Sequence, residues 1–283
     1  MRPAIDVSAI QGRHPQHFGG FDRRRSIALL AGAVALALLL FGMAALDFFS
    51  GKLLAGVARL VEIVGLMLPP DPGSWAHART FGIALLETIA IAFLGTLAAA
   101  VLSLPVALLA ARNVVAQRVV RFLSRRSLDT IRSVDILVWA LIWVNVVGLG
   151  PFAGALAIMT ADIGSFGKLF SEAMEAADRK PVEGIVSAGG SHALAIRFGI
   201  LPEVFPVLAS QVLYYFESNT RSASIIGIVG AGGIGLYLAE AIRTLELPQT
   251  SFIVMLILVA VALIDFVSSQ LRFAVIGRRG AST

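Results

Sequence analysis

The chain has 283 residues, of which 57% are hydrophobic and only 14% are charged. A soluble domain carries about 25% charged residues, so this chain has too little polar surface for a soluble fold. Its net charge of +5 would suit nucleic-acid binding, but the basic residues cluster beside apolar stretches, which favours membrane anchoring. The absence of cysteine excludes disulfides, thiolate metal ligands and cysteine nucleophiles. The composition predicts an integral membrane protein.

The N-terminal part of the chain is predicted to contain a tail, a first transmembrane helix and an amphipathic segment. Residues 1–26 have no apolar periodicity, end near three consecutive arginines and are expected to be a cytoplasmic tail. The uncharged run 27–46 is long enough to cross a bilayer core about 30 Å thick, and it exceeds a cleavable signal. The arginines also fit a twin-arginine export signal, but we favour membrane anchoring. Residues 47–80 alternate apolar and charged side chains at helical spacing, which predicts a periplasmic amphipathic helix.

Further apolar stretches predict five more crossings. They lie at about 81–111, 133–149, 152–170, 204–229 and 252–267. The second and third of these are short, and they fit either full crossings or a re-entrant hairpin. The arginine-rich segment 112–132, the polar loop 171–203 and the tail 276–283 are expected in the cytoplasm.

This topology puts all but five of the 23 lysines and arginines on or beside cytoplasmic segments. Basic residues near membrane spans are strongly enriched on the cytoplasmic side, so their distribution sets the orientation. The sequence therefore predicts an all-α integral membrane protein of about six transmembrane helices, with both termini in the cytoplasm.

The polar loop 171–203 contains the most informative motif. Glu183 is followed by Gly189, and the pair Leu201-Pro202 comes shortly before the next apolar stretch. Pro181 can begin a short helix, Gly189 can reverse the chain without strain, and Pro202 can begin the next span. A helix-turn-helix of this kind can dock in a groove of another protein. An unspecialised loop of this length also needs turns and polar residues, and that alternative stays open.

The spacing resembles the EAA loop of binding-protein-dependent ABC-transporter permeases. In that family the loop reads Glu-Ala-Ala, three residues, Gly, nine residues, Ile, one residue, Leu-Pro. This chain departs from the family pattern at Gly184 and Gly199. The resemblance implies that the loop is the coupling segment that sits on a cytoplasmic ATPase. The implied coupling residues are Glu183, Gly189, Leu201 and Pro202.

Other segments between about residues 81 and 275 are similar to the phosphonate-transport permeases in particular. They are Glu87-Thr88, Gly95-Thr96, Pro105, Ala110 to Asn113, Arg132-Ser133, Leu137 to Ile142, Gly148 to Gly154, Phe216-Glu217, Arg221 to Ala223 and Gly227 to Gly235. The resemblance identifies a phosphonate- or phosphite-type permease subunit of a type I ABC importer in the bacterial inner membrane. Residues 81–275 would form its permease domain.

The resemblance also implies the partners of the chain. They are a second copy of itself, two cytoplasmic ATPases that bind ATP and Mg²⁺, and a periplasmic or lipid-anchored substrate-binding protein. An ion-coupled secondary transporter or channel is the alternative, and the cytoplasmic loop argues against it. A membrane-bound enzyme is a third option, disfavoured because the sequence has no arrangement of catalytic residues.

Ionisable and polar groups within the predicted spans are the candidates for a translocation pathway. Such groups are costly in lipid and usually face a bundle interior or a water-filled cavity. Glu217 and Arg221 share one helix face and are expected in the outer half of the bilayer. Arg221 could attract an oxyanion, or the two residues could pair in a purely structural role. The weaker candidates, which could equally join helices, are Asp135, Asp162, Asn219 and Ser222.

The sequence does not indicate a nucleotide, metal or cofactor site in this chain. Residues 230–235 match the dinucleotide pattern GxGxxG, but no predicted strand precedes them, so these glycines are expected to permit close helix approach or an unwound turn. The sequence has no GxxxxGK[ST] phosphate loop, so ATP hydrolysis would belong to another subunit. The histidines lack metal-ligand spacing, and we expect neither a metal nor a cofactor in this chain.

Overall fold

The computed structural model describes residues 23–46, 48 and 52–277. All regular secondary structure in these ranges is helical, which confirms the predicted all-α class. Most of the two predicted tails, 1–26 and 276–283, lies outside the described residues. The chain divides into two compact units, Met1–Gly65 and Leu66–Thr283, which are considered separately.

The first unit contains α3 (Arg23–Ala45) and nearly all of α4 (Lys52–Leu66). Between Ser26 and Ala45, α3 has a mean hydropathy of 2.6 and buries none of its residues against protein. A helix surrounded by lipid has these properties, because its own backbone hydrogen bonds are satisfied and its apolar side chains need no protein partner. Helix α4 lies within residues 47–80, and the periplasmic location of this predicted amphipathic segment stays a prediction.

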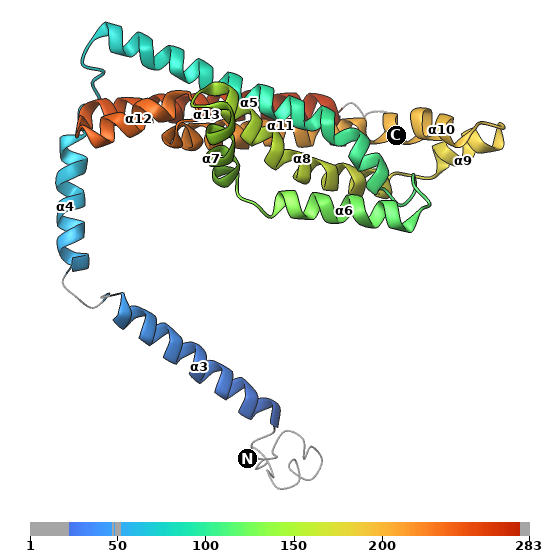
Figure 1. Cartoon of the computed structure of the whole chain (residues 1–283), viewed down its shortest axis with the longest axis horizontal. Coiled ribbons are helices and arrows are strands. Elements are labelled where there is room, and N and C mark those ends of the chain that lie inside the picture. Colours follow the sequence, from blue (N-terminus) through green and yellow to red (C-terminus); the bar gives the residue numbers. More distant parts are fainter. Residues whose placement is uncertain (1–22, 47, 49–51, 278–283) are drawn as a thin grey trace, which may run out of the picture. The chain divides into compact units, whose positions relative to one another are not determined.

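The second unit is a bundle in which α5, α8, α11 and α13 run lengthwise, with α9 and α10 at one end and α12 at the other (Figure 1). Its elements are α5 (Trp75–Ala110), α6 (Arg118–Arg132), α7 (Ile136–Val147), α8 (Pro151–Ala176), α9 (Lys180–Ser187), α10 (His192–Ala195), a π-helical turn (Ile196–Ile200), α11 (Leu201–Ile226), a 3₁₀ turn (Gly227–Val229), α12 (Ile234–Arg243) and α13 (Leu247–Gly277).

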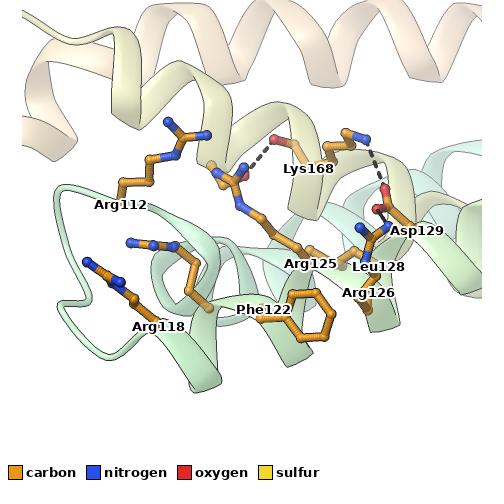
Figure 2. Close-up of a pocket in the computed structure, with 10 residues that line it drawn as sticks. Arg112, Arg118, Phe122, Arg125, Arg126, Leu128, Asp129 and Lys168 are labelled. Atoms are coloured by element: carbon orange, nitrogen blue, oxygen red, sulfur yellow. Dashed lines mark hydrogen bonds and ion pairs between the residues drawn. The ribbon is translucent and has the colours of Figure 1, made fainter.

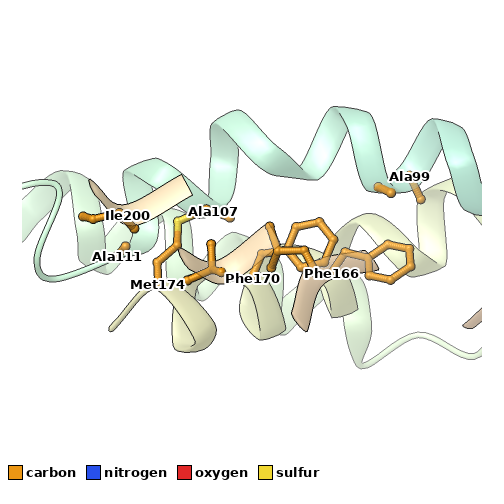
Figure 3. Close-up of a cluster of buried hydrophobic side chains, with 10 residues drawn as sticks. Ala99, Ala107, Ala111, Phe166, Phe170, Met174 and Ile200 are labelled. Carbon is orange, nitrogen blue, oxygen red and sulfur yellow. The ribbon is translucent and has the colours of Figure 1, made fainter. Parts of the chain in front are cut away.

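Helix α8 lies at the centre of the bundle because small residues let its neighbours approach closely. A Cβ atom on Gly95 of α5 would lie 2.7 Å from the Cβ atom of Ile158 in α8. A Cβ atom on Gly164 would lie 2.7 Å from the backbone nitrogen of Arg132 in α6. Neither site has room for a larger residue, as is common where helices pack in membranes. The largest buried cluster joins α5, α8 and α11 (Figure 3), and it contains Ala99, Ala100, Ala107, Ala111, Phe166, Phe170, Met174, Ile200, Val204 and Leu208.

Four helices in the described residues are long and apolar enough to cross a membrane. They are Ser26–Ala45, Trp75–Ala110, His192–Val229 and Leu247–Ala274. A fifth crossing would exist if α6 and α7, which bend by 86° at their junction, formed one broken span. Helix α7 alone has 12 residues, too few to cross a bilayer. Helix α8 has 26 residues but carries several charges, and the predicted count of six crossings stays a prediction.

Candidate functional site

The predicted coupling loop folds as two short helical segments joined by a glycine turn. Pro181 lies in the first turn of α9, as expected, and Glu183 lies exposed in the same turn, where the helix dipole favours an acidic group. Gly189 follows the helix with a φ of +82°, and a Cβ atom placed there would meet nothing within 4 Å. The backbone conformation rather than crowding therefore demands glycine at this turn. Pro202 occupies the first turn of α11, as predicted.

The second half of the loop packs tightly against α9. Gly199 lies buried in the π-helical turn, where a Cβ atom would sit 3.2 Å from Val182 Cγ2 and 3.3 Å from Val182 N. Gly190 packs more tightly against α9, since a Cβ atom placed on it would lie 2.8 Å from the carbonyl oxygen of Ile185. Glycine at position 199, where the family pattern has isoleucine, thus permits close packing. The π-helical turn continues directly into α11, so α9 packs against the segment that begins α11.

Hydrogen bonds attach the loop and the end of α8 to the segment after α5. A ring nitrogen of His192, Nε2, lies 3.0 Å from the carbonyl oxygen of Val114. The side-chain amide of Asn113 donates to the carbonyl oxygen of Met174 at 2.6 Å. The opposite face of α9, around Glu183, Gly184 and Val186, is exposed and is available for contact with another protein.

Two of the predicted pathway residues meet in a buried polar junction of three helices. The side-chain amide of Asn219 in α11 donates to Thr96 Oγ1 of α5, at 2.8 Å, and to Asp162 Oδ2 of α8. Asn219, Thr96 and Asp162 are 4%, 1% and 5% exposed. In this conformation the junction joins helices and has almost no contact with solvent. Thr96 was part of a family motif in the sequence, but nothing there indicated its contact with Asn219.

A second junction surrounds Glu217, whose carboxylate accepts hydrogen bonds from two arginines. Arg221 Nη2 lies 3.3 Å from Glu217 Oε1, which confirms that the two residues can pair. Arg272 Nη1 of α13 lies 3.3 Å from Glu217 Oε2, and Arg272 Nη2 lies 3.8 Å from Asp265. Nothing in the sequence indicated the contact between Arg272 and Glu217, because a contact between separate helices leaves no local sequence signal.

The contact with Arg272 relates the depth of Glu217 in the bilayer to the orientation of α13. At about 1.5 Å per residue, Arg272 lies about 8 Å before Gly277 and about 38 Å from Leu247 at the other end of α13. If the C-terminal end of α13 faces the cytoplasm, Glu217 lies near the cytoplasmic side of the bundle. Because the orientation of the chain stays a prediction, so does the expected position of Glu217 in the outer half of the bilayer.

The remaining predicted pathway residues have local roles in the structure. Asp135 is exposed and caps α7 by accepting a hydrogen bond from Leu137 N at 2.8 Å. The hydroxyl of Ser222 donates to the carbonyl oxygen of Ser218 on its own helix at 3.3 Å. Among the described residues, no hydrogen bond connects Asp135 or Ser222 to Asp162 or Glu217. Their assignment to a pathway stays a prediction.

The glycine-rich segment after α11 forms an unwound turn, one of the two structures expected for it. Gly230, Gly232 and Gly233 have φ values of +95°, +82° and +74°, which favour glycine. The backbone N–H of Gly233 donates to Glu87 Oε1 at 3.0 Å. The N–H of Ile234 donates to Thr88 Oγ1 at 2.8 Å, so side chains of α5 cap the start of α12.

The helical bundle and its long apolar helices are the features of an integral membrane protein. A family model described as binding-protein-dependent transport system inner membrane component matches residues 103–279. The chain therefore belongs to the inner-membrane component family of binding-protein-dependent transport systems. This result confirms the predicted permease family and the location in the inner membrane.

Known relatives and solved structures agree with this assignment. The putative phosphite transport system permease protein HtxC of Stutzerimonas stutzeri is 36% identical over 89% of this chain and 89% of that protein. The phosphite transport system permease protein PtxC of the same organism is 34% identical over 96% of this chain and 98% of that protein. A chain of the MetNI methionine ABC transporter in an inward-facing conformation gives a TM-score of 0.63 at 19% identity, covering 71% of this chain and 99% of that chain. The last comparison shows that the ABC-importer permease fold is shared.

Proposed function

We propose that the chain forms part of the translocation pathway of an importer for phosphite, a phosphonate or a related phosphorus oxyanion. The observation that carries the substrate class is the 36% and 34% identity, over most of the chain, to two proteins named as phosphite transport permeases. The similarity to the methionine transporter is 19% identical and supports the fold alone.

ATP hydrolysis by two partner ATPases would drive the transport, with ATP and Mg²⁺ bound by those subunits and not by this chain. Glu183, Gly189, Leu201 and Pro202 would transmit the movement. A partner that displaces the exposed face of α9 would also displace the π-helical turn, because Gly199 packs directly against Val182. That turn leads into α11, which contributes Asn219 to one polar junction and Glu217 and Arg221 to the other. The loop would therefore move groups inside the bundle.

Uptake by the reconstituted transporter tests the proposed substrate and energy source. Proteoliposomes containing this chain, its ATPases and its binding protein should accumulate phosphite or methylphosphonate when ATP is supplied to the ATPases, and should not accumulate methionine. Accumulation of methionine in place of the phosphorus compounds would contradict the substrate class. Uptake driven by an ion gradient in vesicles that hold this chain alone would favour the secondary-transporter alternative.

We further infer that two copies of the chain enclose the pathway. The alternative is a pair of two different permeases. The intact complex, purified through a tag on this chain, should contain two copies of it and two ATPases when its mass is measured in detergent. One copy together with a second, different permease would contradict the homodimer and would leave the proposed substrate unaffected.

A further inference from the structure

A basic pocket lies between α6, α8 and the segment that follows α5 (Figure 2). Its cavity has a volume of about 540 Å³. Six of the ten lining residues are cations, and they are Arg112, Arg118, Arg121, Arg125, Arg126 and Lys168. Asp129 is the one acidic residue among the lining residues that the structure describes.

One side of the basic pocket is neutralised by acidic groups. Lys168 Nζ lies 2.8 Å from Asp129 Oδ1, and Arg126 Nη1 lies 3.5 Å from Asp129 Oδ2. Glu175 lies beside the pocket and pairs with Arg125 at 2.5 Å and with Arg112 at 3.7 Å. Two carboxylates therefore accompany six cations, and the cavity keeps a net positive charge.

The unbalanced charge lies at the start of α6. In the part of the chain that the structure describes, the guanidinium groups of Arg118 and Arg121 have neither a hydrogen bond nor an ion pair. Figure 2 shows Arg112 and Arg118 together on one side of the pocket, away from Lys168 and Asp129. Cations gathered in this way repel one another, and an anion placed between them would relieve that repulsion.

We propose that the basic pocket binds a phosphate-type oxyanion through Arg118 and Arg121, with Arg112 beside them. A guanidinium presents its N–H groups as a planar fork that matches two oxygens of a phosphate, so several arginines around one cavity suit a tetrahedral oxyanion. This binding site shares no residue with either polar junction.

Two sources can supply such an anion. Helix α6 exposes Phe122, which lines the pocket, at 59%, and its neighbours Val119 and Leu123 at 70% and 59%. Such side chains are suited to contact acyl chains. An acidic phospholipid of the cytoplasmic leaflet could then place its phosphate among the arginines. A free phosphorus oxyanion in the cytoplasm offers the same oxygens without acyl chains.

Binding to the purified full-length chain tests the proposal with two probes. Radiolabelled inorganic phosphate is measured by equilibrium dialysis in detergent. Phosphatidylglycerol is measured by its retention after exchange from vesicles of phosphatidylcholine containing it. The test variant is Arg118→Gln with Arg121→Gln. The matched control is Arg179→Gln with Lys180→Gln, which removes the same charge from exposed positions on the predicted cytoplasmic side.

The proposal predicts that the wild type and the control bind at least one probe, and that the test variant binds it at least about tenfold more weakly. If the test variant loses phosphate binding, the ligand is a free oxyanion. If it loses only the retention of phosphatidylglycerol, the ligand is a lipid head group. Equal binding of both probes by the test and control variants, or no binding by the wild type, would overturn the proposal. If the double variant fails to fold, Arg118→Gln alone removes an exposed side chain and keeps the test decisive.

Discussion

Asn219 holds three helices together by donating from one side-chain amide to Thr96 and Asp162. Replacing it by alanine leaves a buried carboxylate and a buried hydroxyl without this donor. We expect Asn219→Ala to lower the free energy of unfolding by about 1–3 kcal/mol, measured by denaturation in mixed micelles. Ser222→Ala is the control, because its half-buried hydroxyl bonds only within α11, and it should change stability by less than about 0.5 kcal/mol. Equal stability of the two variants would contradict the role of the junction.

The two arginines at Glu217 should contribute unequally. The side chain of Arg272 is 24% exposed and that of Arg221 is 57% exposed, while that of Glu217 is 14% exposed. Arg272→Gln should destabilise the chain by about 1.5–3 kcal/mol, since it removes the more buried charged hydrogen bond. Arg221→Gln should cost less than about 1 kcal/mol, as exposed ion pairs do. Denaturation of the two variants under one condition checks the order, and the reverse order would rule out this assignment.

Glu183 is the exposed acidic group at the start of α9, and changing its charge tests the proposed coupling to the ATPase. Reversing the charge with Glu183→Lys should weaken association with the ATPase by about tenfold or more, because one charged contact is replaced by repulsion. The measurements are co-purification and stimulated ATP hydrolysis by the complex. Glu240→Lys makes the same charge reversal at an exposed position in α12, at the opposite end of the bundle, and should leave both unchanged. A normal Glu183→Lys complex would contradict the proposed coupling.

At the scale of elements, Gly189 and Gly233 both have a positive φ, but only Gly233 is crowded by a neighbouring side chain. Comparing alanine variants of the two therefore distinguishes the free-energy cost of backbone strain from that of crowding. Gly189→Ala should cost about 1–2 kcal/mol, because the left-handed conformation is strained and no atom crowds the new side chain. Gly233→Ala should cost more, since its Cβ atom would also collide with Thr88, which caps α12. Unfolding measurements on both variants check this order. A smaller loss for Gly233→Ala would mean that the cap is not important.

The long helices could be predicted from the sequence because apolar length alone indicates them, as at α3, α5 and α13. Local turn chemistry likewise predicted the roles of Pro181, Gly189 and Pro202. Within the arginine-rich segment 112–132, for which the sequence predicts no helix, residues 118–132 form α6. This segment is highly charged, and its only fully buried side chain among the described residues, Leu128, packs against the glycines of α8. That packing could not be read from residues 118–132 alone.

The contacts that define the candidate site could not be predicted, because their partners are distant in sequence. Asn219 and Thr96 are 123 residues apart, and Gly233 and Glu87 are 146 residues apart. Composition and spacing describe each helix separately, whereas these contacts depend on how the helices pack. The sequence therefore indicated which polar residues were unusual in a membrane and did not indicate which of them meet.

In the whole molecule, the coupling loop and the α12–α13 connection lie at opposite ends of the second unit (Figure 1), and the proposed coupling depends on this arrangement. Helix α11 runs between these ends and contributes a residue to each polar junction, Asn219 to one and Glu217 to the other. Movement of the loop can then change the packing of α11 against α5, α8 and α13. If both ends of the bundle lay on one side of the membrane, no such transmission across the bilayer could occur.

Site-directed labelling tests this arrangement most directly, and the natural chain needs no preparation because it contains no cysteine. Val186→Cys places a thiol at a 54% exposed position on α9, and Leu245→Cys places one at a 76% exposed position between α12 and α13. A membrane-impermeant maleimide applied to intact spheroplasts should label Leu245→Cys at once and Val186→Cys only after permeabilisation. Labelling of Val186→Cys from outside, with Leu245→Cys protected, would contradict the account.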